Sequence, residues 1–228
     1  MNKVEIINLG TLDYRSAWAL QTQQMEALRG ERRKCSDTLP NKLIFVEHPH
    51  VYTLGKNGHL ENMLARDAEV VCVDRGGDIT YHGPGQWVVY PIFRLDTLME
   101  NELPQGIGIK EYIFRLEEVI IKTLAVYGIN SERLEKCTGV WLETETPRVR
   151  KICAMGVRCS EHVTMHGLAL NVNTDLTFFT RINPCGFTDR GVTSMQKELG
   201  GESVNMEEVR TELVRKFCEM FGLETVAL

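Results

Sequence analysis

The run QWVVYPIF at residues 86–93 is apolar at nearly every position. A strand with one face in water alternates between apolar and polar residues, so this run predicts a strand that is buried on both faces. Such a strand belongs at the centre of a sheet. The other segments of the chain then have to supply its neighbours.

The sequence offers both strands and helices that could pack around this central strand. Short apolar or alternating runs predict further strands at residues 4–10, 41–55 (interrupted at Pro49), 69–74, 78–82, 138–143, 151–160 and 163–173. Helical periodicity predicts long helices at residues 13–32, 106–128 and 205–222. Strands joined mostly by short turns, with helices between groups of them, predict an α/β fold of the α+β type. Strict strand–helix alternation, as in a doubly wound parallel sheet, is absent.

The ends and faces of these helices can also be predicted. Asp13 or Ser16 can cap the first helix, and Gly128 is a typical stop for the second. The spacing of the first helix predicts a buried face made of Ala17, Leu20, Gln24, Ala27 and Leu28.

Composition limits the class of protein. The 228 residues are 43% hydrophobic without an internal repeat, and we expect one domain over residues 1–228. No apolar run approaches the ~18 residues of a membrane span, and the N-terminus has no apolar signal segment, so we expect a cytosolic protein. A net charge of −5 argues against a nucleic-acid binder.

Positive charge is nevertheless grouped in two places. Residues 29–34 read RGERRK and residues 148–151 read RVRK, with Arg158 following. On an acidic protein these clusters are either docking surfaces for an acidic partner or ordinary solvated segments.

The segment DRGGDITYHGPGQW at residues 74–87 holds four glycines around one short strand. Glycines at both ends of a strand allow positive φ, or let another chain or a ligand come into contact with the backbone. Arg75, Tyr81 and His82 are interleaved with them. The segment is therefore either an elaborate hairpin or part of a ligand site.

A nucleophile and a base can be picked out. The seven cysteines have no disulfide-like spacing, and Cys72 and Cys153 lie in apolar strands, but Cys185 stands in the polar segment NPCGF. Lys151 opens an apolar strand, where partial desolvation would make its amine a base. Together they would form a minimal acyl-transfer pair, with His82 or backbone amides of the glycine corner (HGPG, residues 82–85) stabilising an oxyanion.

Zinc is a poor alternative. Cys153, Cys159, His162 and His166 have a loosely zinc-like spacing. Four residues along a strand, however, separate the two histidines by about 13 Å, too far to share one ion. We expect neither a metal nor a cofactor.

The motifs HPHVYTLGKNG, RGGDITYHGPGQ, TGVW, KICAMGVR, HGLALNV and NPCGF occur in the order seen in the lipoyl(octanoyl) transferases of lipoate biosynthesis, which this sequence resembles from about residue 45 to 195. The resemblance implies a mixed sheet packed against helices, a fold shared with biotin and lipoate ligases. It implies Cys185 as the carrier of an octanoyl thioester and Lys151 as the residue that lowers its pKa. The implied acyl-binding residues are Arg75, Gly76, Gly77, Asp78, Ile79, Thr80, Tyr81, His82, Ala154, Met155, Gly156, Gly167, Leu168 and Ala169.

The resemblance also implies partners. The donor would be octanoyl-acyl carrier protein, and the acceptors would be lipoyl domains of 2-oxoacid dehydrogenases and the glycine cleavage H protein. The glycines of residues 74–87 would clear the wall of a tunnel for the acyl chain. We expect a monomer. The rival functions are an ATP-dependent lipoate or biotin protein ligase and a non-catalytic acyl- or metal-binding module.

Overall fold

The computed structural model describes residues 2–65, 68–98, 106–183 and 190–226. Nine of the strands in this part of the chain form one mixed sheet, with the order β12-β1-β2-β6-β10-β9-β8-β7 and with β11 added beside β9. Their bounds are β1 Asn2–Thr11, β2 Asn41–Glu47, β6 Gln86–Ile92, β7 Glu132–Leu134, β8 Cys137–Leu142, β9 Arg150–Ser160, β10 Val163–Asn171, β11 Gly191–Val192 and β12 Leu223–Thr225.

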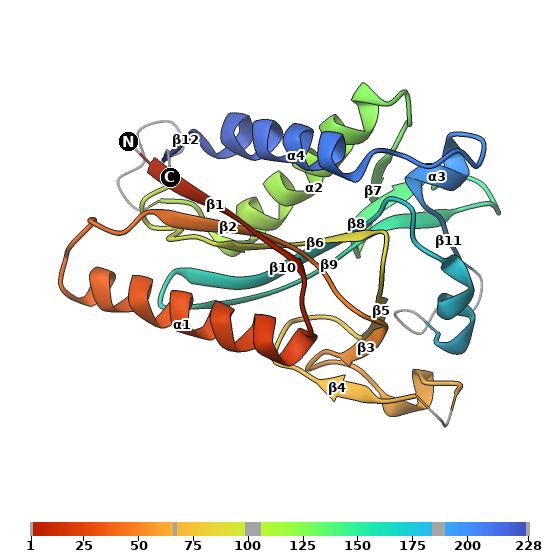
Figure 1. Cartoon of the computed structure of the whole chain (residues 1–228), viewed down its shortest axis with the longest axis horizontal. Helices are drawn as coiled ribbons and strands as arrows, with labels where there is room; N and C mark the ends of the chain where they lie inside the picture. Colours follow the sequence, from red (N-terminus) through yellow and green to blue (C-terminus); the bar gives the residue numbers. More distant parts are fainter. Residues whose placement is uncertain (1, 66–67, 99–105, 184–189, 227–228) are drawn as a thin grey trace.

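Helices cover both faces of this sheet (Figure 1). Helices α2 (Ile109–Val126) and α4 (Met206–Phe221) pack on one face, and α1 (Tyr14–Arg33) packs on the other. Strand β6 lies between β2 and β10, and all seven of its residues are buried, which confirms the predicted central strand. The predicted fold class is confirmed as well.

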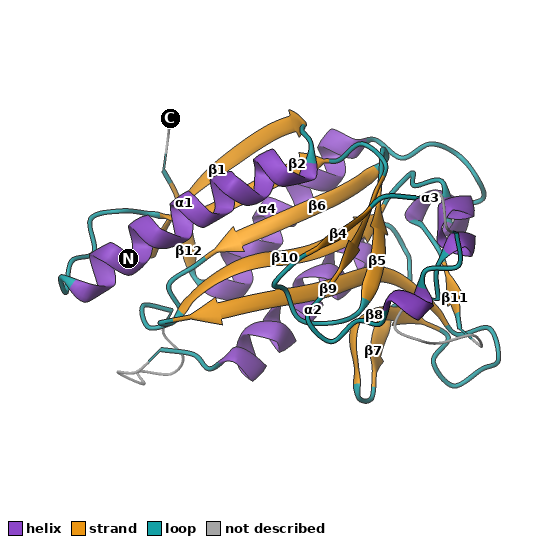
Figure 2. Ribbon diagram, turned by 90° about the horizontal axis from the view of Figure 1, so that it is seen from below, coloured by secondary structure: helices purple, strands orange, loops and turns teal. Residues whose placement is uncertain are grey.

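A second, three-stranded sheet has the order β4-β3-β5 and lies beyond the N-terminal end of α1 (Figure 1). Its strands are β3 (Val51–Leu54), β4 (Val70–Cys72) and β5 (Ile79–His82). Figure 2 shows α1 lying over the large sheet and running roughly along its strands. Three shorter helices complete the described elements: η1 (Leu60–Asn62), η2 (Leu176–Arg181) and α3 (Met195–Glu198). None of the helices in the described ranges is long and apolar enough to cross a membrane.

Helix α1 begins as predicted, but its buried face matches the prediction only in part. The Asp13 side chain accepts a hydrogen bond from the Ser16 amide at 2.9 Å, so Asp13 is the cap. The predicted Leu20 and Gln24 are only half-buried, and Ala27 is exposed. Ala17 and Leu28 are buried as predicted, and the other buried residues are Tyr14, Gln21 and Met25. A pattern of apolar residues cannot reveal a face that includes a buried tyrosine and a buried glutamine.

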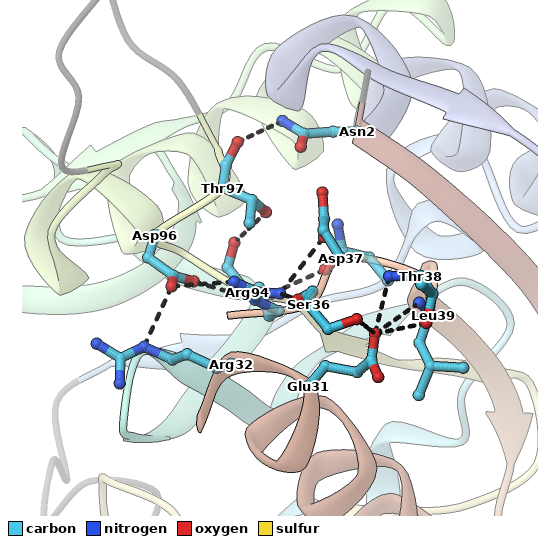
Figure 3. Close-up of polar contacts among 11 residues, drawn as sticks. Asn2, Glu31, Arg32, Ser36, Asp37, Thr38, Leu39, Arg94, Asp96 and Thr97 are labelled. Carbon is cyan, nitrogen blue, oxygen red and sulfur yellow. Dashed lines mark hydrogen bonds and ion pairs between the residues drawn. The ribbon is translucent and has the colours of Figure 1, made fainter. Parts of the chain in front are cut away.

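The C-terminal end of α1 is held by a group of side chains that we call the anchor cluster: Glu31, Arg32, Ser36, Asp37, Thr38, Arg94 and Asp96 (Figure 3). The buried Arg94 guanidinium donates to the Ser36 carbonyl at 2.6 Å and pairs with Asp96 at 3.2 Å. Glu31 accepts from the Thr38 hydroxyl and amide and from the Ser36 hydroxyl. The cluster fixes the end of α1 to the start of β2 and the end of β6.

Candidate active site

A pocket lies between the large sheet and the small one. Its floor is the α1-side face of β6, β10 and β9, and its roof is β5 with the segment that leads into it from Arg75. Strand register arranges the floor in rows, because Val89 pairs with Leu168 and Leu168 pairs with Met155. The row Val88–Ala169–Ala154 on one side of that pair lines the pocket, as do the paired Gly167 and Gly156 on the other side, with Tyr90 on the same end of β6.

Most of the predicted acyl-binding residues line this pocket, although they come from three separate segments of the chain. They are Arg75, Gly77, Asp78, Ile79, Thr80, His82, Ala154, Met155, Gly156, Gly167, Leu168 and Ala169. Gly76 and Tyr81 are not among the lining residues. The Gly76 amide donates to the Val157 carbonyl at 3.0 Å, and the Tyr81 hydroxyl lies 2.6 Å from His50 Nδ1. The role of this set in substrate binding stays a prediction.

The roof segment makes close backbone contacts at several glycines, and the prediction that the glycines of residues 74–87 form the wall of an acyl tunnel stays a prediction. A Cβ on Gly156 would lie 2.5 Å from the Gly76 carbonyl oxygen, and a Cβ on Gly55 would lie 2.3 Å from that of Gly77. Gly85, at φ +77°, faces the Asn173 carbonyl in the same way. Their small size lets the roof segment sit directly on β9 and on the end of β3, which closes the pocket.

Lys151 stands at one end of the pocket, which we call the mouth. Its Nζ donates to the Thr138 carbonyl at 3.4 Å and lies 4.4 Å from the centre of the Trp141 ring. The Arg190 guanidinium lies 5.7 Å from the same ring and also lines the pocket. The mouth therefore combines two cations with an aromatic platform.

Buried Glu117 holds the backbone next to the carbonyl that Lys151 contacts. Its Oε1 accepts from the Gly139 amide at 3.0 Å, next to the Thr138 carbonyl that Lys151 contacts. Burial raises the pKa of the Glu117 carboxyl, while the Gly139 amide and Arg133 act in the opposite direction.

Cys185, the predicted nucleophile, lies outside the described residues, so its distance from Lys151 stays a prediction. Arg190, on the C-terminal side of residues 184–189, lines the pocket. Strand β11 then runs parallel to β9, with Val192 opposite Lys151. Of the two cysteines expected to be embedded in strands, Cys153 is buried, and burial raises its pKa strongly, whereas Cys72 is exposed.

His82 is buried in the pocket wall, and both of its ring nitrogens face protein groups. Nδ1 lies 2.8 Å from Gln86 Oε1, and Nε2 lies 3.3 Å from the Thr53 hydroxyl. Burial, followed by the neighbouring His48, holds the pKa of His82 well below its usual value. A neutral ring engaged on both nitrogens supports the wall, and in this arrangement it has no nitrogen to offer an oxyanion.

The opposite end of the pocket, the deep end, is polar, which the sequence did not indicate. Tyr14, Tyr90 and His166 line it. The Tyr90 hydroxyl lies 2.7 Å from His48 Nε2, and burial raises the pKa of Tyr14 to about 12. Phenols with such pKa values remain neutral hydrogen-bonding groups at physiological pH.

His166 has an unusual environment at this end. Its backbone has φ +58°, in the left-handed region, and its Nε2 lies 2.7 Å from Asp74 Oδ1. Asp74 also pairs with Arg158. Burial lowers the pKa of His166 to about 4, although Asp74 opposes the shift. The neutral ring therefore carries its proton on Nε2, facing the carboxylate, and presents Nδ1 as an acceptor.

His162, the other histidine of the zinc alternative, is exposed in the turn between β9 and β10. Within the described ranges, no group of histidine, cysteine, aspartate and glutamate side chains is arranged to hold a metal ion.

The arginines of the two basic clusters are largely compensated within the chain. Glu161 pairs with Arg29 and Arg33, Asp96 with Arg32, Glu143 with Arg148 and Arg150, Glu198 with Arg150, and Asp74 with Arg158. Their use as docking surfaces for an acidic partner stays a prediction. Such a partner would have to compete with the carboxylates that already pair with these arginines.

Comparison with known proteins places these observations in a family. The model of the lipoyl protein ligase A/B catalytic domain matches residues 13–218. The chain is 52% identical over 212 residues to the octanoyltransferase of Bacteroides fragilis, covering 90% of this chain and 92% of the relative. It is 48% identical over 237 residues to the octanoyltransferase of Christiangramia forsetii, covering 98% of each.

Solved structures give the same fold. The bi-partite lipoate protein ligase of Thermoplasma acidophilum matches with a TM-score of 0.70 at 16% identity, covering 100% of this chain and 88% of that one. A lipoate-protein ligase A bound with ATP matches with a TM-score of 0.64 at 15% identity, covering 99% and 89%. At such low identity the likeness concerns the fold alone, and it confirms the predicted similarity to lipoate ligases.

Proposed function

We infer the reaction from one premise: the chain belongs to the lipoyl protein ligase A/B catalytic family and, within it, to the octanoyltransferases, which are acyltransferases of lipoate biosynthesis. We propose that it moves an octanoyl group from octanoyl-acyl carrier protein to a lysine of a lipoyl domain. The proposed acceptors are the lipoyl domains of 2-oxoacid dehydrogenases and the glycine cleavage H protein. The proposed unit is a single domain, residues 1–228, acting as a monomer.

In the first half of the reaction, the Cys185 thiolate attacks the thioester carbonyl of the donor. The bond to the carrier sulfur breaks, the carrier thiolate takes up a proton, and the octanoyl group stays on Cys185. Exchange of one thioester for another is nearly isoenergetic, so this half needs mainly a thiolate and orientation. The Lys151 and Arg190 cations at the mouth are suited to stabilise that thiolate.

In the second half, the acceptor lysine attacks the acyl-enzyme. Its amine must lose a proton, and Lys151 is the base that we assign to this step. The products are an amide and the free Cys185 thiol. Because conversion of a thioester to an amide is downhill, the reaction needs no ATP.

The observation that carries this proposal is an apolar slot that begins at Lys151. The row Val88–Ala169–Ala154 lies between the mouth and the deep end and presents only small or aliphatic side chains. Burial of a seven-carbon aliphatic tail at ~0.8 kcal/mol per methylene supplies on the order of 5 kcal/mol before ordering costs. We place the acyl carbonyl at the mouth and the tail along this row.

His82 receives a positioning role in this scheme, because its two nitrogens hold Gln86 and Thr53. The glycine corner, residues 82–85, is the other candidate for the oxyanion, although Pro84 has no N–H and the Gly85 amide already donates to Glu47 at 2.7 Å.

The test is the mass of the intact protein after incubation with octanoyl-acyl carrier protein. We expect an increase of one octanoyl group without ATP, and no increase in Cys185→Ala. An adduct that requires ATP and a free acid would identify a ligase instead. No adduct with an active donor would favour a non-catalytic acyl-binding module.

A further inference from the structure

Strand β9 is irregular at the point where it carries Lys151. Val140 of β8 pairs with Cys153 of β9. The next residue of β8, Trp141, pairs with Lys151 rather than with Ile152. Strand β9 therefore has one residue more than β8 at this point, which is a β-bulge.

The bulge decides which way the Lys151 side chain points. Residues of a regular strand alternate between two faces, so Lys151 would share a face with Cys153, which is buried in the core beneath α2. Instead, the consecutive Ile152 and Cys153 both lie in that core. Lys151 lines the pocket, as Ala154 does. Bulges next to active sites re-aim side chains in this way.

The facing segment of β8 fits around the Lys151 side chain. Gly139 has φ +121°, which favours glycine, and a Cβ there would lie 2.6 Å from the Cys153 carbonyl oxygen and 3.4 Å from Lys151 Cε. The Thr138 carbonyl accepts from Lys151 Nζ at 3.4 Å, and the centre of the Trp141 ring lies 4.4 Å from the same nitrogen. The position of this segment therefore helps to set the position of the amine.

Glu117 of α2 holds the segment in place. The pairing of β7 with β8 also shifts here, between Glu132 and Leu134, so Gly139 lies where both ladders of β8 are irregular. The Gly139 amide donates to Glu117 Oε1 at 3.0 Å, and the Arg133 guanidinium donates to Oε2 at 3.1 Å. The Glu117 side chain is only 10% exposed. A carboxylate accepts at both oxygens, so it can serve both donors at once.

We propose that Glu117 is a positioning residue for Lys151, and that it acts through the Thr138–Gly139 segment of β8. The inference rests on the proposed function, in which Lys151 is the base for the acceptor lysine. Loss of the Glu117 acceptor would leave the buried Gly139 amide unpaired, and the segment would shift toward another partner. A displacement of about 1 Å at a reacting group can cost roughly 10²-fold in rate.

The test isolates the step that needs the base. The acyl-enzyme is formed with octanoyl-acyl carrier protein and is then discharged either by a lipoyl domain or by hydroxylamine. Hydroxylamine is already unprotonated at neutral pH, so its attack needs no base, whereas the acceptor lysine depends on Lys151. In Glu117→Leu we expect discharge by the lipoyl domain to slow by roughly tenfold to hundredfold, while discharge by hydroxylamine changes less than about twofold. An unchanged rate with the lipoyl domain, or an equal loss with both nucleophiles, would overturn the proposal.

Two further variants separate positioning from a general structural effect. Glu118→Leu is the matched control, because Glu118 is the next residue of α2 and pairs with the same Arg133 at 2.8 Å, whereas the Gly139 amide donates to Glu117. We expect both discharge rates of this control to stay within about twofold of wild type. Glu117→Gln keeps an oxygen for the Gly139 amide and should recover most of the rate with the lipoyl domain. A rate as low as that of Glu117→Leu would overturn the proposed action through Gly139.

Glu117→Asp covers the case in which Glu117→Leu does not fold, as judged by thermal melting. Its carboxylate is one methylene shorter and does not reach both donors, so we expect the same selective loss with the lipoyl domain. Discharge by the lipoyl domain at the wild-type rate would overturn the proposal. Failure of wild type to form an acyl-enzyme with an active donor would refute the proposed function instead, so the two failures can be told apart.

Discussion

Helix α1 carries a polar cluster near each of its ends, and the two differ in how far they are buried. In the anchor cluster at its C-terminal end only Arg94 is buried, and the other members are half-buried or exposed. Near its N-terminal end, Tyr14, Gln21, Tyr90 and His166 are all buried, and the Gln21 side chain hydrogen-bonds to Tyr90. The anchor cluster is therefore open to water, whereas the deep end is enclosed by protein groups.

The difference between the two ends of α1 predicts that one contributes mainly to stability and the other to function. A fully satisfied polar network makes the local structure more rigid, and truncating one of its members costs folding free energy. Buried polar groups that line a pocket can also serve a ligand there, so a change in them should affect the site as well as stability. Substitutions at the two ends of α1, and at the pocket it borders, should therefore change different measured quantities.

The largest expected effect lies at the mouth of the pocket. Lys151→Arg keeps the positive charge but loses the base, because a guanidinium does not give up its proton. We expect kcat to fall by roughly 10² to 10⁴ with little change in melting temperature. Turnover at the wild-type rate would remove the base assignment while leaving an electrostatic role open.

The next effect is the response of the deep end to acid. The pKa of His166 in the folded state is about 4, below the ~6.5 of an unfolded chain, so the unfolded state binds the proton first as pH falls. Its contribution, on the order of 3 kcal/mol, is present above pH ~6.5 and is lost on acidification toward pH ~4.

His166→Asn tests this window, because asparagine tolerates the left-handed backbone at this position. The difference in unfolding free energy between wild type and variant, from urea titrations at several pH values, should shrink between these limits. A difference that stays constant with pH would exclude His166 as the titrating group.

A smaller effect is expected at the anchor cluster. Arg94→Leu removes the donor to Ser36 and the partner of Asp96, and we expect a loss of about 2 kcal/mol of unfolding free energy with unchanged kcat/KM. Arg15→Ala is the matched control, because its ion pair with Glu69 is exposed on both sides. If Arg94→Leu lowered kcat/KM as well as the unfolding free energy, the anchor cluster would affect activity too, and the proposed difference between the two ends of α1 would be wrong.

The smallest effect concerns Glu31. Hydrogen bonds, chiefly from Thr38, lower the pKa of its carboxyl to about 2, so its contribution is present above the unfolded value near 4.3 and is lost as pH falls toward 2. The difference between wild type and Glu31→Gln should thus be constant at neutral pH and shrink only below pH ~4.5. His166 and Glu31 would then change the unfolding free energy in two separate pH ranges. If the two pH ranges overlapped, the two ends of α1 could not be told apart by titration.

Much of the fold could be predicted because its signals are local. The apolar run of β6, the periodicity of α2 and the Asp13 cap each depend on neighbours within a few residues. Strands β7, β11 and β12 were missed, since two or three residues are too few to establish an alternation.

The candidate site was predictable only in part. Motif residues were gathered into one pocket as expected, but the deep end depends on contacts between distant segments, such as Asp74 with His166. Gln21 was assigned to no face, since a buried glutamine looks like a surface residue in sequence. The glycines were noticed, yet the group that approaches them, the backbone of the same chain, became evident only in three dimensions.

The strands that form the floor of the pocket have a second face, which packs against α2 and α4. Along β9, β10 and β6, residues alternate between the slot and the hydrophobic core beneath α2 and α4, so Cys153, Leu170 and Val89 stand back to back with pocket-facing neighbours. Close packing transmits a change of volume through such a strand. Laboratory evolution for a new acyl length is therefore expected to select substitutions at these three positions, none of which ever meets the substrate.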